Sequence, residues 1–237
     1  MRKRRPPGWR VYRMLILIFW PLKWWCRLEV QGIETIPESG AVLVVSNHDS
    51  WMDPLALGAA IMTRDRPLRF LAKASLWHTW IQRVLLDGMG QIPIERGVGD
   101  TQAMQAAIDA LAAGDAVGIF PEGTISRGRP MRARRGVARL AQGAPSAAVV
   151  LAAVSGGTDA IRFPKRPHIV VDLFDPAGGQ PRPDEPPGDL AERLMAEVRE
   201  RVPPVAAGRH PEAAAPEPAA RPAEAPVAAA EADAPGR

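Results

Sequence analysis

Residues 41–62 read AVLVVSNHDSWMDPLALGAAIM, and the fold class can be predicted from them. Residues 41–45 form a short, continuous apolar run, which is typical of a buried strand. Residues 54–62 are also mostly apolar but open with a proline, which favours the first turn of a helix. The residues between these two apolar runs, where the strand ends, are mostly polar. A strand that leads into a helix in this way is the basic unit of an α/β domain.

The chain on the C-terminal side of this stretch repeats the same alternation. Further strands are predicted at 68–72, 91–94, 116–120, 147–154 and 168–174. Helices are predicted at 76–86, 101–112, 136–142 and 190–201. The helix at 101–112 has the clearest signals, because Asp100 or Thr101 can cap its start and Gly114 can end it. The sequence therefore predicts an α/β fold with a mixed sheet flanked by helices.

The length and composition indicate one folded domain with two appendages. A chain of 237 residues with 46% hydrophobic content can bury a single core. We assign that core to residues 28–202. Residues 203–237 are rich in Ala, Pro and Glu and contain no aromatic residue, Leu or Ile, so we predict a disordered tail there. Residues 1–27 form the other appendage.

The N-terminal appendage has the composition of a membrane anchor. Eight basic residues precede the first acid, Glu29, and because the whole chain carries only +4, the remainder is net acidic. This balance argues against nucleic acid as a partner and suits the anionic cytoplasmic face of a cell membrane. All seven tryptophans lie in the first 80 residues, and tryptophan prefers the headgroup level of a bilayer. The apolar run at 14–20 stops at Pro21, so we expect an interfacial helical anchor rather than a spanning one.

A cleaved signal peptide is the alternative explanation of this N-terminus. A basic start and an apolar run fit its first two regions. No small-residue cleavage site follows, because the run leads into Trp24, Trp25, Cys26 and Arg27. Cys26 is the only cysteine, so the chain has no internal disulfide that would point to an oxidising compartment.

The polar residues after the first strand predict an acid–base pair. His48 precedes Asp53 by five residues, and the turn between them can bring the carboxylate to one ring nitrogen. The other ring nitrogen is then a base for a hydroxyl proton. A surface turn made by Asn47, Asp49 and Ser50, with His48 incidental, is the plain alternative.

Two further segments occupy comparable places at strand ends. Residues 120–124 read FPEGT, and the glycine after an acid predicts a tight turn whose N–H groups and Thr124 hydroxyl can hold an anionic oxygen. Glu122 can orient polar groups of an acceptor or brace nearby arginines. Residues 90–96 read GQIPIER, and the guanidinium of Arg96 is well shaped for a phosphate. Each segment alone is also compatible with an ordinary turn or a solvated loop.

The three segments together resemble the first three sequence blocks of the lysophosphatidic acid acyltransferase family of glycerolipid acyltransferases. Asn47, His48 and Asp53 match the His-four-residues-Asp (HX4D) block, and the resemblance covers about residues 28–175. It implies the glycerolipid acyltransferase fold, a role in phospholipid biosynthesis, and acyl-CoA or acyl-carrier-protein as the donor. It implies no cofactor and no metal.

The resemblance also implies roles for individual residues. His48 and Asp53 correspond to the family's charge-relay pair, and the acceptor phosphate would be held by Arg96 together with Glu122, Gly123 and Thr124. Lys73 resembles a family lysine and is expected to contact a phosphate or headgroup. The chain departs from the family at Ile125, where arginine is frequent, and in residues 150–154, which lack the usual proline. Both departures concern the identity of the acceptor, so an acyltransferase that uses another lysolipid or a glycolipid as acceptor is an open alternative to lysophosphatidic acid.

The expected mechanism is direct acyl transfer. His48 removes the acceptor's hydroxyl proton, the oxygen attacks the thioester carbonyl, and Asp53 stabilises the imidazolium. A serine hydrolase is disfavoured because no Gly-x-Ser-x-Gly elbow occurs. A zinc hydrolase is disfavoured because His78, His168 and His210 show no ligand spacing.

Two further alternatives remain open. A non-catalytic lipid-binding protein would use the same anchor and basic residues, although the joint presence of His48, Asp53, Glu122 and Gly123 argues against it. A basic run can bind donor phosphates or an acidic carrier protein, or form a solvated or membrane-facing surface. The run consists of Arg127, Arg129, Arg132, Arg134, Arg135 and Arg139.

Overall fold

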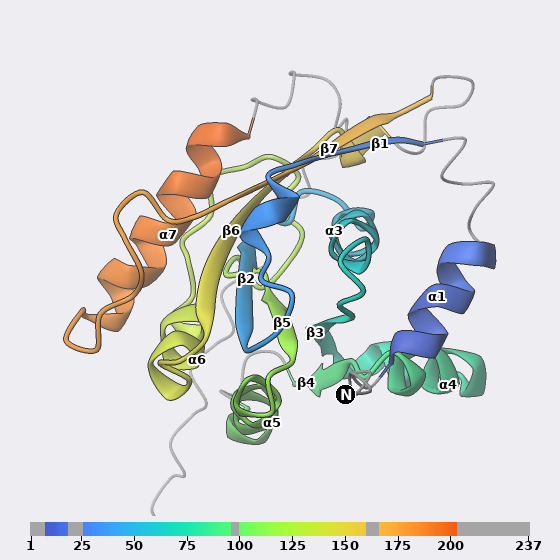
Figure 1. Cartoon of the computed structure of the whole chain (residues 1–237), viewed down its shortest axis with the longest axis horizontal. Coiled ribbons are helices and arrows are strands. Elements are labelled where there is room, and N and C mark those ends of the chain that lie inside the picture. Colours follow the sequence, from blue (N-terminus) through green and yellow to red (C-terminus); the bar gives the residue numbers. More distant parts are fainter. Residues whose placement is uncertain (1–7, 19–25, 96–99, 160–165, 203–237) are drawn as a thin grey trace, which may run out of the picture.

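A seven-stranded sheet forms the centre of the computed structural model, which describes residues 8–18, 26–95, 100–159 and 166–202 (Figure 1). The strand order is β1-β7-β6-β2-β5-β3-β4. Every neighbouring pair is parallel except β6 with β7, which confirms the predicted mixed sheet. The strands are β1 (Arg27–Gln31), β2 (Val42–Ser46), β3 (Leu68–Lys73), β4 (Ile92–Ile94), β5 (Ala116–Ile119), β6 (Ala148–Ser155) and β7 (His168–Phe174). The predicted tail at 203–237 lies outside the described residues.

The helices follow the predicted order. They are α1 (Trp9–Ile18), α3 (Asp53–Met62), α4 (Trp80–Gly88), α5 (Thr101–Ala112), α6 (Gly136–Gly143) and α7 (Pro187–Arg201), with short 3-10 helices at η1 (Ile33–Thr35), η2 (Ala74–Trp77) and η3 (Gly157–Asp159). Helix α5 has both of its predicted ends. Its cap is Asp100, whose side chain accepts a hydrogen bond from the Ala103 N–H at 2.9 Å.

Two elements differ from the prediction. The helix expected at 76–86 is divided, because Thr79 and Gln82 form a capping box that starts α4 at Trp80 and leaves η2 as a separate turn. Strand β1 was not predicted. Its residues are half-buried or exposed, so it lacks a clear apolar signal, and its place depends on pairing with β7 at the sheet edge.

The sheet separates two hydrophobic layers because successive side chains of a strand point to opposite faces. In β2, Leu43 and Val45 pack with the buried sides of α5, α6 and α7. Val42 and Val44 pack with the buried side of α3. Figure 1 shows the same arrangement, with α5, α6 and α7 on one side of the sheet and α3 on the other. Strand β2 is buried along its whole length, which explains its continuous apolar sequence.

Helix α1, the described part of the predicted anchor, packs against the domain. Tyr12 is 5% exposed, its hydroxyl donates to the Leu68 carbonyl, and Gln91 Nε2 donates to the Tyr12 oxygen at 3.0 Å. Burial raises the pKa of the Tyr12 hydroxyl well above its usual range. Within the described ranges, no helix is long and apolar enough to cross a membrane.

The topology brings two loops to the same edge of the sheet. Strand β2 lies between β5 and β6 and is parallel to both. The helix after β2 covers one face of the sheet and the helix after β5 covers the other (Figure 1). The loops that leave the carboxyl ends of β2 and β5 therefore meet at a point where the chain turns in opposite directions. Such a point is the usual place for a ligand site in an α/β sheet.

Candidate active site

His48 and Asp53 are brought together by the turn between β2 and α3. His48 follows the end of β2, and Asp53 is the first residue of α3. The two side chains face one another, with 3.4 Å between His48 Nδ1 and Asp53 Oδ2. A distance of this kind is common for acid–base partners before substrate binds. The predicted pair is therefore assembled locally, within six residues of the chain.

The Asp53 carboxylate is enclosed by protein. It is 1% exposed, and its Oδ2 accepts a hydrogen bond from the Ser50 N–H at 2.7 Å. Burial raises the pKa of Asp53, while the hydrogen bonds from His48 and Ser50 act in the opposite direction. The backbone of Gly157 covers the other oxygen so closely that a Cβ there would lie 2.7 Å from Asp53 Oδ1. These contacts hold the Asp53 carboxylate in place with Oδ2 facing His48 Nδ1.

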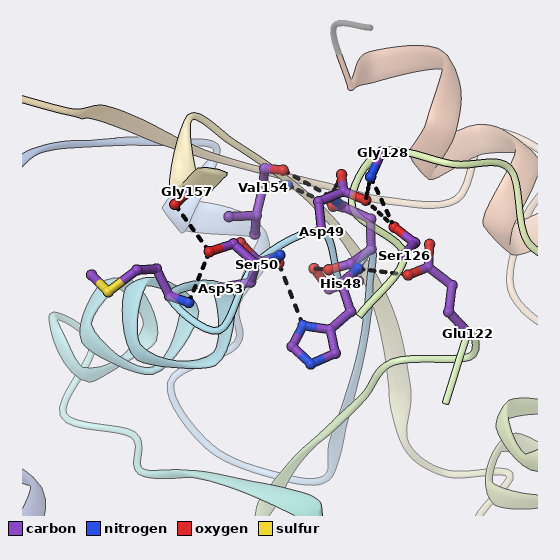
Figure 2. A network of polar contacts seen from close by, with 12 residues as sticks. His48, Asp49, Ser50, Asp53, Glu122, Ser126, Gly128, Val154 and Gly157 are labelled. Atoms are coloured by element: carbon purple, nitrogen blue, oxygen red, sulfur yellow. Dashed lines mark hydrogen bonds and ion pairs between the residues drawn. The ribbon is translucent and has the colours of Figure 1, made fainter. Parts of the chain in front are cut away.

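The His48 ring is held between its acid partner and an aromatic stack. Its centroid lies 4.3 Å from that of Phe120, at an interplanar angle of 21°, and Phe120 stacks on Phe70 at 5.3 Å. Figure 2 shows the ring with one nitrogen turned toward the α3 turn. Since Nδ1 faces Asp53, Nε2 is the ring nitrogen on the side away from the acid. Only 8% of the residue is exposed.

A cavity of about 490 Å³ opens beside His48. Much of its wall is apolar, and the rest includes three arginines near the start of α6. The apolar residues are Leu71, Ile94, Met104, Ile119 and Phe120, and the arginines are Arg134, Arg135 and Arg139. Apolar walls with a few convergent charges are typical of a site for an amphipathic ligand.

The turn at residues 122–124 packs against one of these arginines at the cavity wall. Gly123 has φ of 71°, a conformation that favours glycine, and it lines the cavity. The side chain of Arg134 lies directly against it, so that a Cβ at Gly123 would be 2.5 Å from Arg134 Nε. The glycine therefore serves both the tight turn and the approach of the guanidinium.

The backbone of His48 is fixed on both sides by the loop after β5. Its N–H donates to Glu122 Oε2 at 3.0 Å, and its carbonyl accepts from the Ser126 N–H at 2.7 Å (Figure 2). The neighbouring Asn47 side chain is bonded to β6, donating to the Val154 carbonyl and accepting from the Val154 N–H, each at 2.8 Å. The position of the histidine therefore depends on both strands that flank β2.

Helix α7 contributes a guanidinium beneath this loop. Arg199 Nη1 lies 3.0 Å from both oxygens of Asp49, and Nη2 donates to Glu122 and to Ser126 Oγ. Burial acts to raise the pKa of Asp49, but the Ser126 hydrogen bond and the Arg199 charge hold it below its usual range. Asp49 is therefore ionised at neutral pH.

The other predicted site residues differ in whether they line the cavity, lie exposed beside it or are buried. Gly123 lines the cavity, Thr124 is exposed just beyond it, and Lys73 is exposed at the end of β3. Glu122, predicted to contact the substrate, is 1% exposed and directed at the His48 N–H and Arg199, because these two donors surround its carboxylate. It braces an arginine, which was the second role predicted for it. Arg96 lies outside the described residues.

Sequence reasoning missed several residues that surround the histidine. Asp49 was considered only as a turn former, although an acid within the histidine motif was a signal that it is buried and paired. Arg134 was recognised only as one member of a basic run. Arg199 had no local signal, because it lies 150 residues from Asp49 in the chain.

Comparison with known proteins gives a consistent family. The model of the family described as Acyltransferase matches residues 27–155. Over 108 residues the chain is 36% identical to the 1-acyl-sn-glycerol-3-phosphate acyltransferase of Borreliella burgdorferi, covering 45% of this chain and 42% of that protein. Over 131 residues it is 34% identical to the lyso-ornithine lipid O-acyltransferase of Pseudomonas aeruginosa, covering 54% and 48%. Each match spans less than half of the relative's length.

A solved structure has the same fold. The crystal structure of the 1-acyl-sn-glycerophosphate acyltransferase PlsC from Thermotoga maritima is similar with a TM-score of 0.64 and 20% sequence identity, covering 84% of this chain and 81% of that one. At this level of identity the likeness concerns the fold. It confirms the predicted arrangement of a mixed sheet flanked by helices.

Proposed function

Because this chain belongs to the Acyltransferase family, we propose that it moves a fatty acyl group from acyl-CoA or acyl-carrier-protein to the free hydroxyl of lysophosphatidic acid, giving phosphatidic acid. The observation that carries the proposal is the buried His48–Asp53 pair at the wall of a cavity that combines apolar side chains with arginines. An acyl chain suits the apolar wall, and a phosphate suits the guanidinium groups.

The chemistry follows from the orientation of the His48 ring. Nε2 takes the proton of the acceptor hydroxyl while the hydroxyl oxygen forms a bond to the thioester carbonyl carbon. The carbon–sulfur bond then breaks, and the departing thiolate recovers the proton from the imidazolium. Asp53 stabilises the imidazolium and holds Nδ1 in its protonated form. The step needs no covalent enzyme intermediate and no metal.

The preference for a phosphate-bearing acceptor rests on the cavity arginines. Arg134, Arg135 and Arg139 line the wall beside His48, and Arg134 is brought in by Gly123. Three guanidinium groups favour an anionic headgroup. A lyso-ornithine acceptor is the second candidate, supported by the 34% identity to the Pseudomonas aeruginosa protein. A lipid-binding protein without catalysis is the third, and the histidine–aspartate pair argues against it.

We place the reaction at a membrane surface, on the cytoplasmic side. Helix α4 exposes large apolar side chains, with Trp80 75%, Val84 61% and Ile81 53% accessible. Helix α1 contacts the end of α4 at Gly88, so the two helices lie side by side (Figure 1). A tryptophan-bearing apolar face of this kind suits the interfacial region of a bilayer. Membrane lipid is the partner that this face supports.

An acceptor panel tests the proposal. Purified protein in detergent is incubated with labelled acyl-CoA or acyl-carrier-protein and with lysophosphatidic acid, lyso-ornithine lipid or lysophosphatidylcholine. We expect transfer to lysophosphatidic acid above the other acceptors, and loss of transfer in His48→Ala with an unchanged melting temperature. Preferred transfer to lyso-ornithine lipid would show that this lipid, and not lysophosphatidic acid, is the acceptor. No transfer to any acceptor, or full turnover by His48→Ala, would reject the function or the base.

A further inference from the structure

Arg199 connects the last helix, α7, to two loops that lie far apart in the sequence. From the last turn of α7 it contacts Asp49, in the loop after β2, and Glu122 and Ser126, in the loop after β5. Asp49 is contacted through both of its oxygens, each 3.0 Å from Nη1. Contact with several acceptors at once uses the planar fork of the guanidinium, which a lysine ammonium lacks.

Each of these contacts leads to the backbone of His48 in one further step. Glu122 accepts from the His48 N–H with Oε2, the oxygen that the Arg199 Nη2 contact leaves free. Ser126 donates its N–H to the His48 carbonyl while its hydroxyl contacts Asp49 and Arg199. Asp49 follows His48 directly in the chain. Displacement of Arg199 therefore acts on the histidine through both of its peptide groups.

The charge balance makes Arg199 difficult to replace. Asp49 is 5% exposed and Glu122 is 1% exposed, so two carboxylates share one guanidinium in a region with little access to water. Removing one partner of a buried ion pair leaves an uncompensated charge and moves the surrounding loops. The loops that would move are the two that carry His48 and line the cavity.

We propose that Arg199 is a positioning residue of the acyl-transfer site, holding the His48 backbone through Glu122, Ser126 and Asp49. The inference rests on the proposed function. None of Arg199, Asp49 and Glu122 lines the cavity beside His48, so Arg199 acts through other residues and has no contact with the substrate. Its loss should slow the chemical step while the affinity for acceptor and donor stays nearly the same.

Kinetics of matched variants on α7 test the positioning role. Arg201 lies two residues further on, pairs with Asp172 at 3.1 Å and packs over Phe174, so Arg201→Met removes the same charge from the same helix. We expect Arg199→Met to lower kcat roughly 100-fold, the typical effect of misplacing a reacting group by about 1 Å, with KM of both substrates nearly unchanged. Arg201→Met should keep wild-type kcat, and Arg199→Lys should recover part of the loss.

Stability is measured in parallel by thermal denaturation. If Arg199→Met does not fold, Arg199→Lys becomes the test, because it keeps the charge and loses only the fork. A lower kcat with a cooperative melt then supports the proposal. Wild-type kcat in an Arg199 variant, a selective rise in acceptor KM, or an equal loss in Arg201→Met would overturn it.

A spectroscopic measurement separates this inference from the proposed function. In protein labelled with ¹⁵N-histidine, the ring signals of His48 are identified by their absence in His48→Ala. We expect them to shift in Arg199→Met and to stay in place in Arg201→Met, whatever the substrate is. Unchanged His48 signals in the Arg199 variant would reject the positioning role. Absence of turnover by the wild-type protein on every acceptor would reject only the function.

Discussion

Asp53 shows how one buried side chain can serve activity at the expense of stability. Its carboxylate is 1% exposed, has hydrogen-bonding contacts with the Ser50 N–H and His48, and is overlaid by Gly157. Burial of an ionised acid is unfavourable unless its partners compensate, and burial raises the pKa of Asp53 despite those partners. The acid is therefore retained for what it does to the histidine.

Replacing Asp53 by Asn should separate these two effects. The folded protein binds the Asp53 proton more tightly than the unfolded chain does, because the folded pKa is raised. Stability contributed by this group therefore falls as the pH rises from the unfolded pKa, about 4, through the folded pKa. Asn has no such transition, so we expect Asp53→Asn to be at least as stable as wild type at pH 7 while kcat falls about 100-fold or more.

Urea denaturation at a series of pH values measures the stability, and single-acceptor kinetics measure kcat. Ser50→Ala is a useful comparison, because it keeps the Ser50 N–H, which donates to Asp53, and removes the hydroxyl, which donates to the Gly157 carbonyl and accepts from the Met52 N–H. A large loss of stability in Asp53→Asn at pH 7 would contradict the expectation that the ionised acid is unfavourable to folding.

The loops between elements, rather than the strands, hold the site together. The loop after β2 carries His48, the loop after β5 carries Glu122, and η3 after β6 closes over Asp53. Because β2 lies between β5 and β6, the ends of the three strands are neighbours. A change in one of these loops should therefore affect the reacting groups before it affects the core.

Gly157→Ala tests the contact between η3 and the acid. A methyl group there would lie 2.7 Å from Asp53 Oδ1 and 3.1 Å from Ser50 Cβ, so Asp53 or the η3 turn must move. We expect kcat to fall at least tenfold, with roughly 1 to 3 kcal/mol lost from the free energy of unfolding. Gly188→Ala, whose nearest neighbour would be 3.9 Å away, is the matched control and should retain activity. Normal kcat in Gly157→Ala would show that the turn tolerates displacement.

Helix α6 and the segment that leads into it should supply the acceptor's phosphate contacts. Arg134 and Arg139 line the cavity, whereas the side chain of Arg132 is 83% exposed and is absent from the cavity wall. We expect the Arg134→Ala and Arg139→Ala variants to raise the acceptor KM about tenfold each while kcat changes little, because one charged hydrogen bond is worth about 1.5 kcal/mol or more. Arg132→Ala should behave as wild type. An equal rise in donor KM would assign the arginines to the donor's phosphates.

Across the described part of the molecule, the three most exposed large apolar side chains lie together on one helix. Helix α4 contributes Trp80, Ile81 and Val84, and η2 contributes Leu76, which is 45% exposed. The helix α1 beside them is held by Tyr12, which is buried between α3 and β3. Deleting residues 1–27 would therefore disturb the core as well as the membrane contact, and surface substitutions on α4 make the cleaner test.

Changing Trp80, Ile81 and Val84 together to Ser should weaken binding to vesicles of anionic phospholipid. Each large apolar side chain that leaves water contributes roughly 1.5 kcal/mol, so we expect partitioning to fall about 100-fold or more. Met131→Ser, at a 37% exposed position on the loop before α6, is the control and should bind normally. High salt should leave wild-type binding largely intact, since salt screens only charge. Unchanged vesicle binding in the triple variant would exclude α4 from the membrane contact.

Much of the fold was predictable because its signals are local. The apolar runs of β2, β5 and β6, the Asp100 cap of α5 and the proline at the start of α3 act over a few residues, and each element lies within a few residues of its prediction. The His48–Asp53 pair belongs to the same group, since the turn that joins the two residues spans only four others. Burial patterns and caps need no knowledge of what packs against them.

The remaining features depend on which distant surfaces meet. Strand β1 has no strong apolar pattern, and its place in the sheet depends on pairing with β7. Tyr12 is buried because α1 packs near Leu68, a residue 56 positions further along the chain. In the sequence, Arg199 is one of several charged residues on a predicted helix. The packing of α7 brings it into contact with the loops after β2 and β5, although it lies 150 residues from Asp49 in the chain. An arginine side chain is long and flexible, so its partners are set by the packing of the helix that carries it and not by its neighbours in sequence.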